Sequence, residues 1–256
     1  MNIGVSSACL YPQYLEEALD RLEASGFTDF EIFFNAYSEL DPKYLASIRK
    51  DRKIISVHPF TSGFESFLLF SEHYRRFRDT AEGYKHYFSA AALLGARIFV
   101  LHGERDYDRS KISEEEYFER FAYLSNIAGE FGITLAQENV NRFRSENPEF
   151  IRRMRRYLND ECAFVLDIKQ AVRAGFSPFA MLEAMGGKIT HVHLSDHNRD
   201  ENCLPPGKGD FDFSRLFRAL SDVGFAGTPV IELYRRNFRE ICELTEAKEY
   251  LRHIFQ

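Results

Sequence analysis

The sequence predicts an α/β fold built as a single (β/α)8 TIM barrel that spans residues 1–256. Three observations carry this prediction. Short apolar runs rich in Ile, Val and Phe alternate with longer amphipathic stretches, eight such runs are present, and no change in composition marks a domain boundary. A doubly wound open sheet is the alternative fold, but no glycine-rich phosphate loop follows the first run.

The eight apolar runs, taken in order, are the predicted strands. They cover residues 2–7, 29–34, 54–60, 97–103, 133–139, 162–168, 189–196 and 228–234. Signals of helix starts and ends lie between them: Pro12 and Gly26 around the first helix, Asp41-Pro42 before the second, Gly95 after a helical region from about 64 to 94, Ser113 before three glutamates, Gly132, and Asn147-Pro148 before a basic helix. The segment after the seventh strand is rich in proline and glycine and is expected to form a loop.

Charge and composition limit the classes of partner. A net charge of -6 argues against a nucleic-acid surface, which needs clustered Lys and Arg. The amino terminus lacks the basic flank and apolar run of a signal peptide, and no apolar run reaches the roughly 18 residues of a membrane span. The four cysteines lie far apart, which indicates free thiols in a reducing compartment. We therefore expect a cytoplasmic protein with no membrane partner, and the net charge disfavours nucleic acid as a partner.

Acidic side chains stand at the carboxyl ends of three predicted strands. Glu138, Asp167 and Glu232 each end one strand, and His193 shares a strand face with His191 because alternate side chains point the same way. In a barrel these strand ends converge on the face that carries active sites. Burying an unpaired carboxylate costs on the order of several kcal/mol, so a positive group must accompany the three acids.

Two kinds of positive group would satisfy these acids. One divalent metal ion, Mn, Mg, Co or Zn, would accept oxygen and imidazole ligands. Alternatively, Lys169, Arg235 or Arg236 forms ordinary ion pairs, although an arginine next to an acid in a strand points to the other face. We favour the metal ion. His191 either orients a metal ligand through a hydrogen bond or belongs to the core.

Four short motifs carry a resemblance to a known family. They are ENVNRF with Glu138, LDIKQ with Asp167, HVHLSD with His193, and VIELY with Glu232. Together with the order of strands, they resemble the xylose isomerase-like TIM-barrel superfamily, which holds sugar isomerases, ketose 3-epimerases, inosose dehydratases and endonuclease IV. The resemblance implies that these four residues are metal ligands and that the substrate is a small carbohydrate.

Further positions resemble particular branches of this superfamily. The NRF after Glu138, together with Arg199 and the Pro-Gly-Lys-Gly of 206–209, is similar to the ketose 3-epimerases. His58 and His102 end the third and fourth predicted strands, where endonuclease IV has two further zinc ligands. In a sugar enzyme these two histidines are expected to contact substrate hydroxyls.

The sequence departs from the family pattern at three positions. Gln170 stands where the family often has a histidine, and Cys203 stands where a loop commonly carries another. Glutamine still hydrogen-bonds a sugar hydroxyl and cysteine still binds zinc, but both changes argue against a three-zinc nuclease. Arg144 replaces an acid that contacts substrate in the epimerases, which favours an anionic or phosphorylated sugar.

The residues and the resemblance imply a metal-dependent sugar or sugar phosphate isomerase or epimerase. Glu138 and Glu232 are expected to transfer a proton at a carbon next to a carbonyl, through an enediolate that the metal stabilises. The alternatives are an inosose-type dehydratase, an endonuclease IV-like zinc hydrolase acting on abasic DNA, and a sugar-binding barrel without activity. The families that the chain resembles imply a homodimer or homotetramer.

Overall fold

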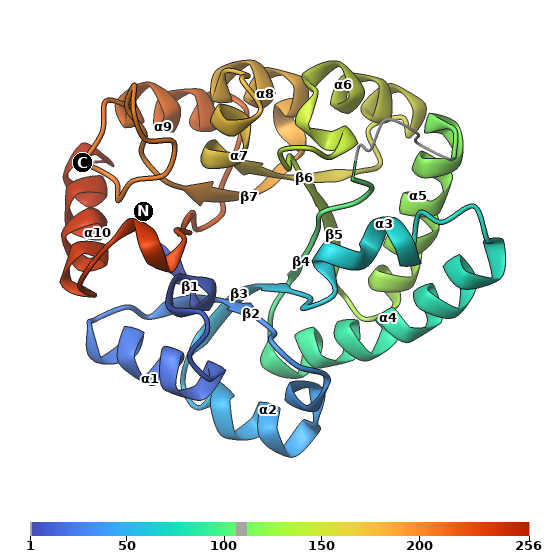
Figure 1. Ribbon diagram of the computed structural model, residues 1–256, viewed down its shortest axis with the longest axis horizontal. Helices are drawn as coiled ribbons and strands as arrows, with labels where there is room; N and C mark the ends of the chain where they lie inside the picture. The colour runs from blue at the N-terminus through green and yellow to red at the C-terminus, as the bar shows by residue number, and fades with distance from the viewer. Residues whose placement is uncertain (1, 106–111, 256) are drawn as a thin grey trace.

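Eight parallel strands close into a barrel in the computed structural model, which describes residues 2–105 and 112–255 (Figure 1). The strands are β1 (Gly4–Ser6), β2 (Asp29–Phe33), β3 (Lys53–His58), β4 (Ile98–Leu101), β5 (Thr134–Glu138), β6 (Ala163–Asp167), β7 (Ile189–Leu194) and β8 (Val230–Ile231). They are hydrogen-bonded in sequence order, and β8 pairs with β1. The predicted (β/α)8 TIM barrel is confirmed.

The α-helices form a ring outside the strands (Figure 1). Within the described residues they are α1 (Leu15–Ala24), α2 (Pro42–Arg49), α3 (Glu65–Leu68), α4 (Tyr74–Leu94), α5 (Glu114–Glu130), α6 (Pro148–Tyr157), α7 (Ile168–Arg173), α8 (Pro178–Met185), α9 (Phe213–Asp222) and α10 (Cys242–Phe255). Two predicted helix starts are confirmed by their caps. The side chain of Asp41 accepts hydrogen bonds from the backbone N–H groups of Lys43 and Tyr44, and Ser113 accepts one from Glu116.

The helical region expected from about 64 to 94 is two helices rather than one. α3 ends at Leu68 and α4 begins at Tyr74. The Arg120 guanidinium of α5 accounts for the break, because it donates to the backbone carbonyls of Leu69 and Ser71. These carbonyls would accept backbone hydrogen bonds in a continuous helix.

The interior of the barrel changes from apolar to charged along the strands. Val100, Ala136 and Val165 belong to a small apolar cluster that is separate from the main core. Glu138 and Asp167 come two residues after Ala136 and Val165, so they point to the same side of their strands. The charged side chains therefore lie at the carboxyl ends of the strands, which is the end that carries active sites in this fold.

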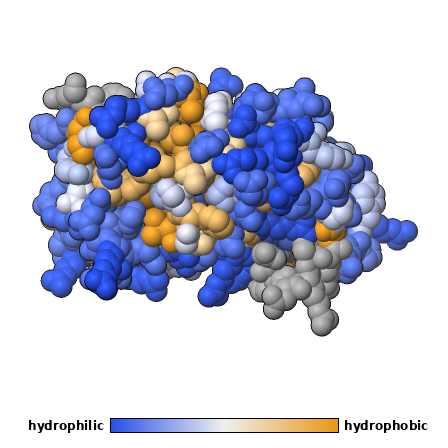
Figure 2. All heavy atoms as spheres, turned by 90° about the horizontal axis from the view of Figure 1, so that it is seen from above, coloured by the Kyte–Doolittle hydropathy of each residue, from blue (hydrophilic) through white to orange (hydrophobic). Residues whose placement is uncertain are grey.

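The main core lies between the strands and the surrounding helices, and it is rich in aromatic rings. Phe88 and Tyr84 of α4 pack edge-on against Phe99 of β4. The face of the molecule in Figure 2 is largely hydrophilic, with an apolar patch to the left of its centre. No helix among the described residues is long and apolar enough to cross a membrane.

Candidate functional site

A cavity of about 420 Å³ opens at the carboxyl ends of the strands. Its walls are of two kinds. The apolar and aromatic wall includes Tyr11, Phe33, Phe60, Leu233 and Tyr234. The polar wall includes His58, His102, Glu138, Lys169, Gln170 and Glu232. A concave site with an apolar side and several converging polar groups is suited to a small polar molecule with a carbon skeleton.

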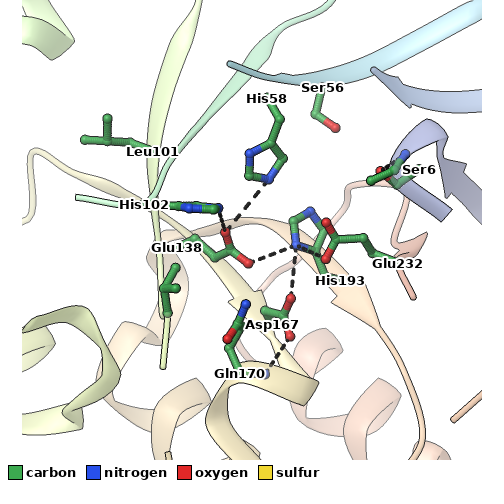
Figure 3. Close-up of polar contacts among 12 residues, drawn as sticks. Ser6, Ser56, His58, Leu101, His102, Glu138, Asp167, Gln170, His193 and Glu232 are labelled. Carbon is green, nitrogen blue, oxygen red and sulfur yellow. Dashed lines mark hydrogen bonds and ion pairs between the residues drawn. The ribbon is translucent and has the colours of Figure 1, made fainter. Parts of the chain in front are cut away.

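Three carboxylates converge on one imidazole nitrogen at this cavity (Figure 3). The Nδ1 atom of His193 lies 3.3 Å from Glu138 Oε1 and 3.4 Å from both Asp167 Oδ2 and Glu232 Oε2. The four residues come from the ends of β5, β6 and β7 and from the position after β8. One ligand atom from each lies within 4.8 Å of the others. We call these four residues the acidic cluster; the structure brings together all four residues predicted as ligands.

Glu31 in the middle of β2 is a fourth buried acid, which the sequence reasoning missed. Its Oε2 accepts hydrogen bonds from Nε2 of His193 at 3.0 Å, Nε2 of His191 at 2.9 Å and Oγ of Ser56 at 2.7 Å. The bond to His193 Nε2 turns Nδ1 of the same ring toward the three acids. His191 therefore binds the acid that orients a candidate ligand. The sequence signal was a glutamate between Phe30 and Ile32 in an otherwise apolar strand.

Lys169 supplies a positive charge inside the acidic cluster. Its Nζ forms ion pairs with Asp167 Oδ2 and Glu232 Oε2. The expectation that an arginine next to an acid points to the other face does not apply to Lys169, which lies two residues after Asp167, the N-cap of α7. The ion pairs that Lys169 forms are the alternative to a metal ion that the sequence left open. Arg235 instead donates to backbone carbonyls, and Arg236 lies over the Tyr234 ring.

Opposing effects of burial and charge set the protonation of the acidic cluster. Burial acts to raise the pKa of Glu138, but His102 and His193 outweigh burial and hold that pKa well below its usual range. Burial raises the pKa of Asp167 to about 6, against the opposing effect of the Lys169 ammonium. Burial acts to lower the pKa of Lys169, but Asp167 and Glu232 outweigh it and hold that pKa well above its usual range. At pH 7 the cluster therefore combines ionised acids with a charged lysine.

Comparison with known proteins assigns the chain to a family. The family model described as xylose isomerase-like TIM barrel matches residues 19–254. The chain belongs to this family. The protein MJ1311 of Methanocaldococcus jannaschii is 27% identical over 268 residues, which cover 98% of this chain and 89% of that protein. The inosose isomerase of Bacillus subtilis is 27% identical over 132 residues, 46% of this chain and 46% of that protein.

Solved structures of other proteins share the fold of this xylose isomerase-like barrel. A D-tagatose 3-epimerase-like protein superimposes with a TM-score of 0.79 at 22% identity, over 100% of this chain and 97% of that chain. The IOLI protein with a bound zinc atom has a TM-score of 0.73 at 19% identity, over 100% of this chain and 96% of that chain. At these identities the likeness concerns the fold.

Two further histidines of this xylose isomerase-like barrel approach Oε2 of Glu138, the carboxylate oxygen that His193 does not contact. His102 Nε2 lies 3.0 Å and His58 Nε2 3.8 Å from Glu138 Oε2 (Figure 3). Burial lowers the pKa of His58 to about 4, so His58 is neutral at pH 7. His58, His102 and Glu138 form a second group whose ligand atoms lie within 4.8 Å of one another. Both histidines line the cavity, as does Gln170.

The two arginines predicted to bind substrate lie outside the described walls of the cavity. Arg144 Nε pairs with Glu104 Oε2 at 2.8 Å, and its Nη2 donates to the backbone carbonyl of Ile112. Glu104 therefore already neutralises the positive charge of Arg144, which was expected to bind an anionic sugar. Arg199 is exposed in the segment after β7, and Cys203 of the same segment is buried.

Proposed function

We propose that the chain is a metal-dependent sugar or sugar phosphate isomerase or epimerase that moves a proton at a carbon next to a carbonyl. One observation carries the proposal: three carboxylate oxygens lie 3.3 to 3.4 Å from His193 Nδ1 at the wall of a cavity. Structural neighbours that include an L-ribulose 3-epimerase support the substrate class. The family and the cavity are compatible with a small carbohydrate.

The donor set of the acidic cluster fits a divalent metal ion. Three carboxylate oxygens and one imidazole nitrogen within 4.8 Å of one another are ligands that Mn, Mg, Co and Zn accept. The position of Glu31 also fits, because a carboxylate behind the imidazole orients a ligating histidine in many metal sites. Bound there, a divalent ion would act as a Lewis acid that stabilises negative charge developing on the substrate oxygens.

The protein's own residues perform the proton transfer in this proposal. Glu138 and Glu232 both line the cavity and come from different strands, so one removes a proton from the substrate carbon and the other returns a proton. In this proposal the imidazole of His102, which lies beside Glu138, donates to a substrate hydroxyl. Gln170 lines the same cavity and contributes an amide for a second hydroxyl.

The aromatic side of the cavity sets the orientation of the sugar. Phe33, Phe60 and Tyr234 stand among its lining residues. Aromatic surface favours contact with the C–H face of a sugar, while the hydroxyls turn to the polar wall. We therefore expect the substrate to present a neutral C–H face to these aromatic rings.

Metal content and solvent isotope uptake test the proposal together. Protein purified without chelator should hold about one Mn, Co, Mg or Zn per chain, measured by plasma mass spectrometry. Incubation with a panel of ketoses and ketose phosphates in D₂O should then place deuterium at the carbon next to the carbonyl, detected by NMR. The proposal fails if no cation binds after incubation with each metal, or if no sugar exchanges a proton.

A zinc hydrolase acting on abasic DNA is the second candidate, and the group of His58, His102 and Glu138 favours it. This group adds nitrogen ligands of the kind that zinc prefers and shares Glu138 with the acidic cluster. The net charge of -6 opposes it, because DNA binding rests on clustered positive charge. Two or three zinc ions per chain with cleavage of an abasic duplex would replace the isomerase proposal.

A further inference from the structure

Lys169 is a cation buried inside the acidic cluster. It is 2% exposed, and its Nζ pairs with Asp167 Oδ2 and Glu232 Oε2. Across the described ranges 2–105 and 112–255, no second lysine or arginine forms an ion pair with these acids, Glu138 or Glu31. An ammonium is costly to bury without partners, so the acids hold Lys169 where it lies.

The two oxygens that Lys169 binds are also the oxygens that face His193. Asp167 Oδ2 and Glu232 Oε2 each lie 3.4 Å from His193 Nδ1, and both acids belong to the group that could hold the proposed metal ion. An ammonium and a divalent ion on the same two oxygens repel each other at short range. The side chain of Lys169 therefore competes with a metal ion for two members of the acidic cluster, Asp167 and Glu232.

The cavity offers Lys169 a second position. Lys169 is among the residues that line it, and Nζ lies 5.6 Å from the centre of the Tyr234 ring. Arg173 and Arg236 already lie over this ring, each 5.5 Å from its centre, so the room for the ammonium is in the cavity beside Tyr234. Because the lysine side chain has four flexible carbon atoms, rotations about its own bonds can carry the charge off the two oxygens while the backbone of α7 stays in place.

We propose that Lys169 is an internal counter-ion that holds Asp167 and Glu232 when no divalent ion is bound, and that a bound divalent ion displaces it into the cavity. This inference rests on the metal site of the proposed function. Lys169 lowers the affinity for the ion, because binding must break two ion pairs, and it stabilises the ion-free fold. In its displaced position the ammonium lies in the cavity, where it donates to an oxygen of the sugar.

The experiment measures Mn²⁺ affinity and stability for wild type and Lys169→Met. Competition with a chelating dye should give a dissociation constant that is lower by about tenfold or more in Lys169→Met, because a neighbouring positive charge is gone. In EDTA the variant should melt several degrees below wild type, and added Mn²⁺ should raise its melting temperature more than that of wild type. Lys169→Gln still donates to one acid, so its Mn²⁺ dissociation constant and its melting temperature in EDTA should lie between those of wild type and Lys169→Met. It replaces Lys169→Met if that variant does not fold.

Lys248→Met is the matched control, because Lys248 is also buried but donates to the carbonyl of Gly26, outside the acidic cluster. Its Mn²⁺ affinity should equal that of wild type. If wild type binds Mn²⁺ and the Lys169 variants bind it equally or more weakly, the counter-ion role is overturned while the metal site stands. If neither wild type nor any variant binds a divalent ion, both the counter-ion role and the proposed function are overturned.

Discussion

Two buried glutamates near the same cavity differ in charge because their neighbours differ. Glu65 of α3 is fully buried and accepts hydrogen bonds from the Gly103 N–H at 2.6 Å and the Tyr84 hydroxyl at 3.2 Å. Burial raises the pKa of Glu65 to about 7. Glu138 is equally buried, but His102 and His193 hold its pKa well below its usual range. His102 acts on both acids, but at Glu65 burial outweighs it together with the neutral hydrogen-bond donors, whereas the two imidazoles of His102 and His193 keep Glu138 ionised.

This contrast explains why the acidic cluster is suited to chemistry. An acid that stays ionised at neutral pH can bind a cation or accept a proton, and the environment of Glu138 provides that state. Glu65 contributes structure instead, because its carboxyl group joins α3 to the chain just after β4 through the Gly103 N–H. Substitutions that remove the charge at one site or the other should separate these roles.

Glu232→Gln should produce the largest effect. Its amide keeps the shape of the side chain but removes a proton acceptor and a ligand charge, so kcat for deuterium exchange should fall by roughly 10²–10⁴-fold. Glu65→Gln is the matched control, a buried glutamate replaced in the same way, and should keep kcat within a few-fold of wild type. Single-turnover exchange assays on both variants measure this difference. If Glu65→Gln lost as much activity as Glu232→Gln, the separate roles of the two buried acids would be contradicted.

Glu65→Gln should change the pH dependence of stability. The pKa of Glu65 rises from an unfolded value of 4.5 to about 7 in the folded protein. Between pH 4.5 and 7 the folded chain keeps a proton that the unfolded chain has lost, so the free energy of unfolding decreases as pH rises through this window. The full change amounts to about 3 kcal/mol.

Urea denaturation at pH 5 and at pH 7.5 measures this effect. Between the two values wild type should lose stability relative to Glu65→Gln, which carries no titrating group at this position. Exposed Glu130→Gln serves as the control and should follow wild type at both pH values. A constant difference between wild type and Glu65→Gln across the range would show that Glu65 is ionised in the folded protein, and the contrast with Glu138 would disappear.

The barrel and the acidic cluster could be predicted from the sequence because both depend on strand periodicity. Glu138 and Glu232 were found because an acid at the end of an apolar strand is conspicuous. Glu31 was missed because it lies in the middle of its strand, where its partners come from β3 and β7 rather than from sequence neighbours. Lys169 was given less weight than a metal ion because the argument about opposite faces concerned an arginine next to an acid, whereas Lys169 lies two residues after Asp167 and reaches it.

Glu31→Gln should produce a smaller effect than the loss of a ligand, because Glu31 acts on His193 from behind. Its Oε2 lies 3.0 Å from His193 Nε2, and without the carboxylate charge the imidazole becomes less basic and less firmly oriented. Metal affinity should fall by roughly 10–100-fold, with a smaller loss of kcat at saturating metal.

Ser56→Ala is the matched control for this substitution, because it removes another donor to the same oxygen and leaves the contact between Glu31 and His193 intact. It should change the Mn²⁺ dissociation constant much less than Glu31→Gln does. Equal loss of affinity in the two variants would assign the effect to packing of the barrel interior. A loss confined to Glu31→Gln would show that the charge of Glu31 acts on the His193 imidazole. Buried acids and imidazoles would then set each other's charge at Glu31 as they do at Glu138.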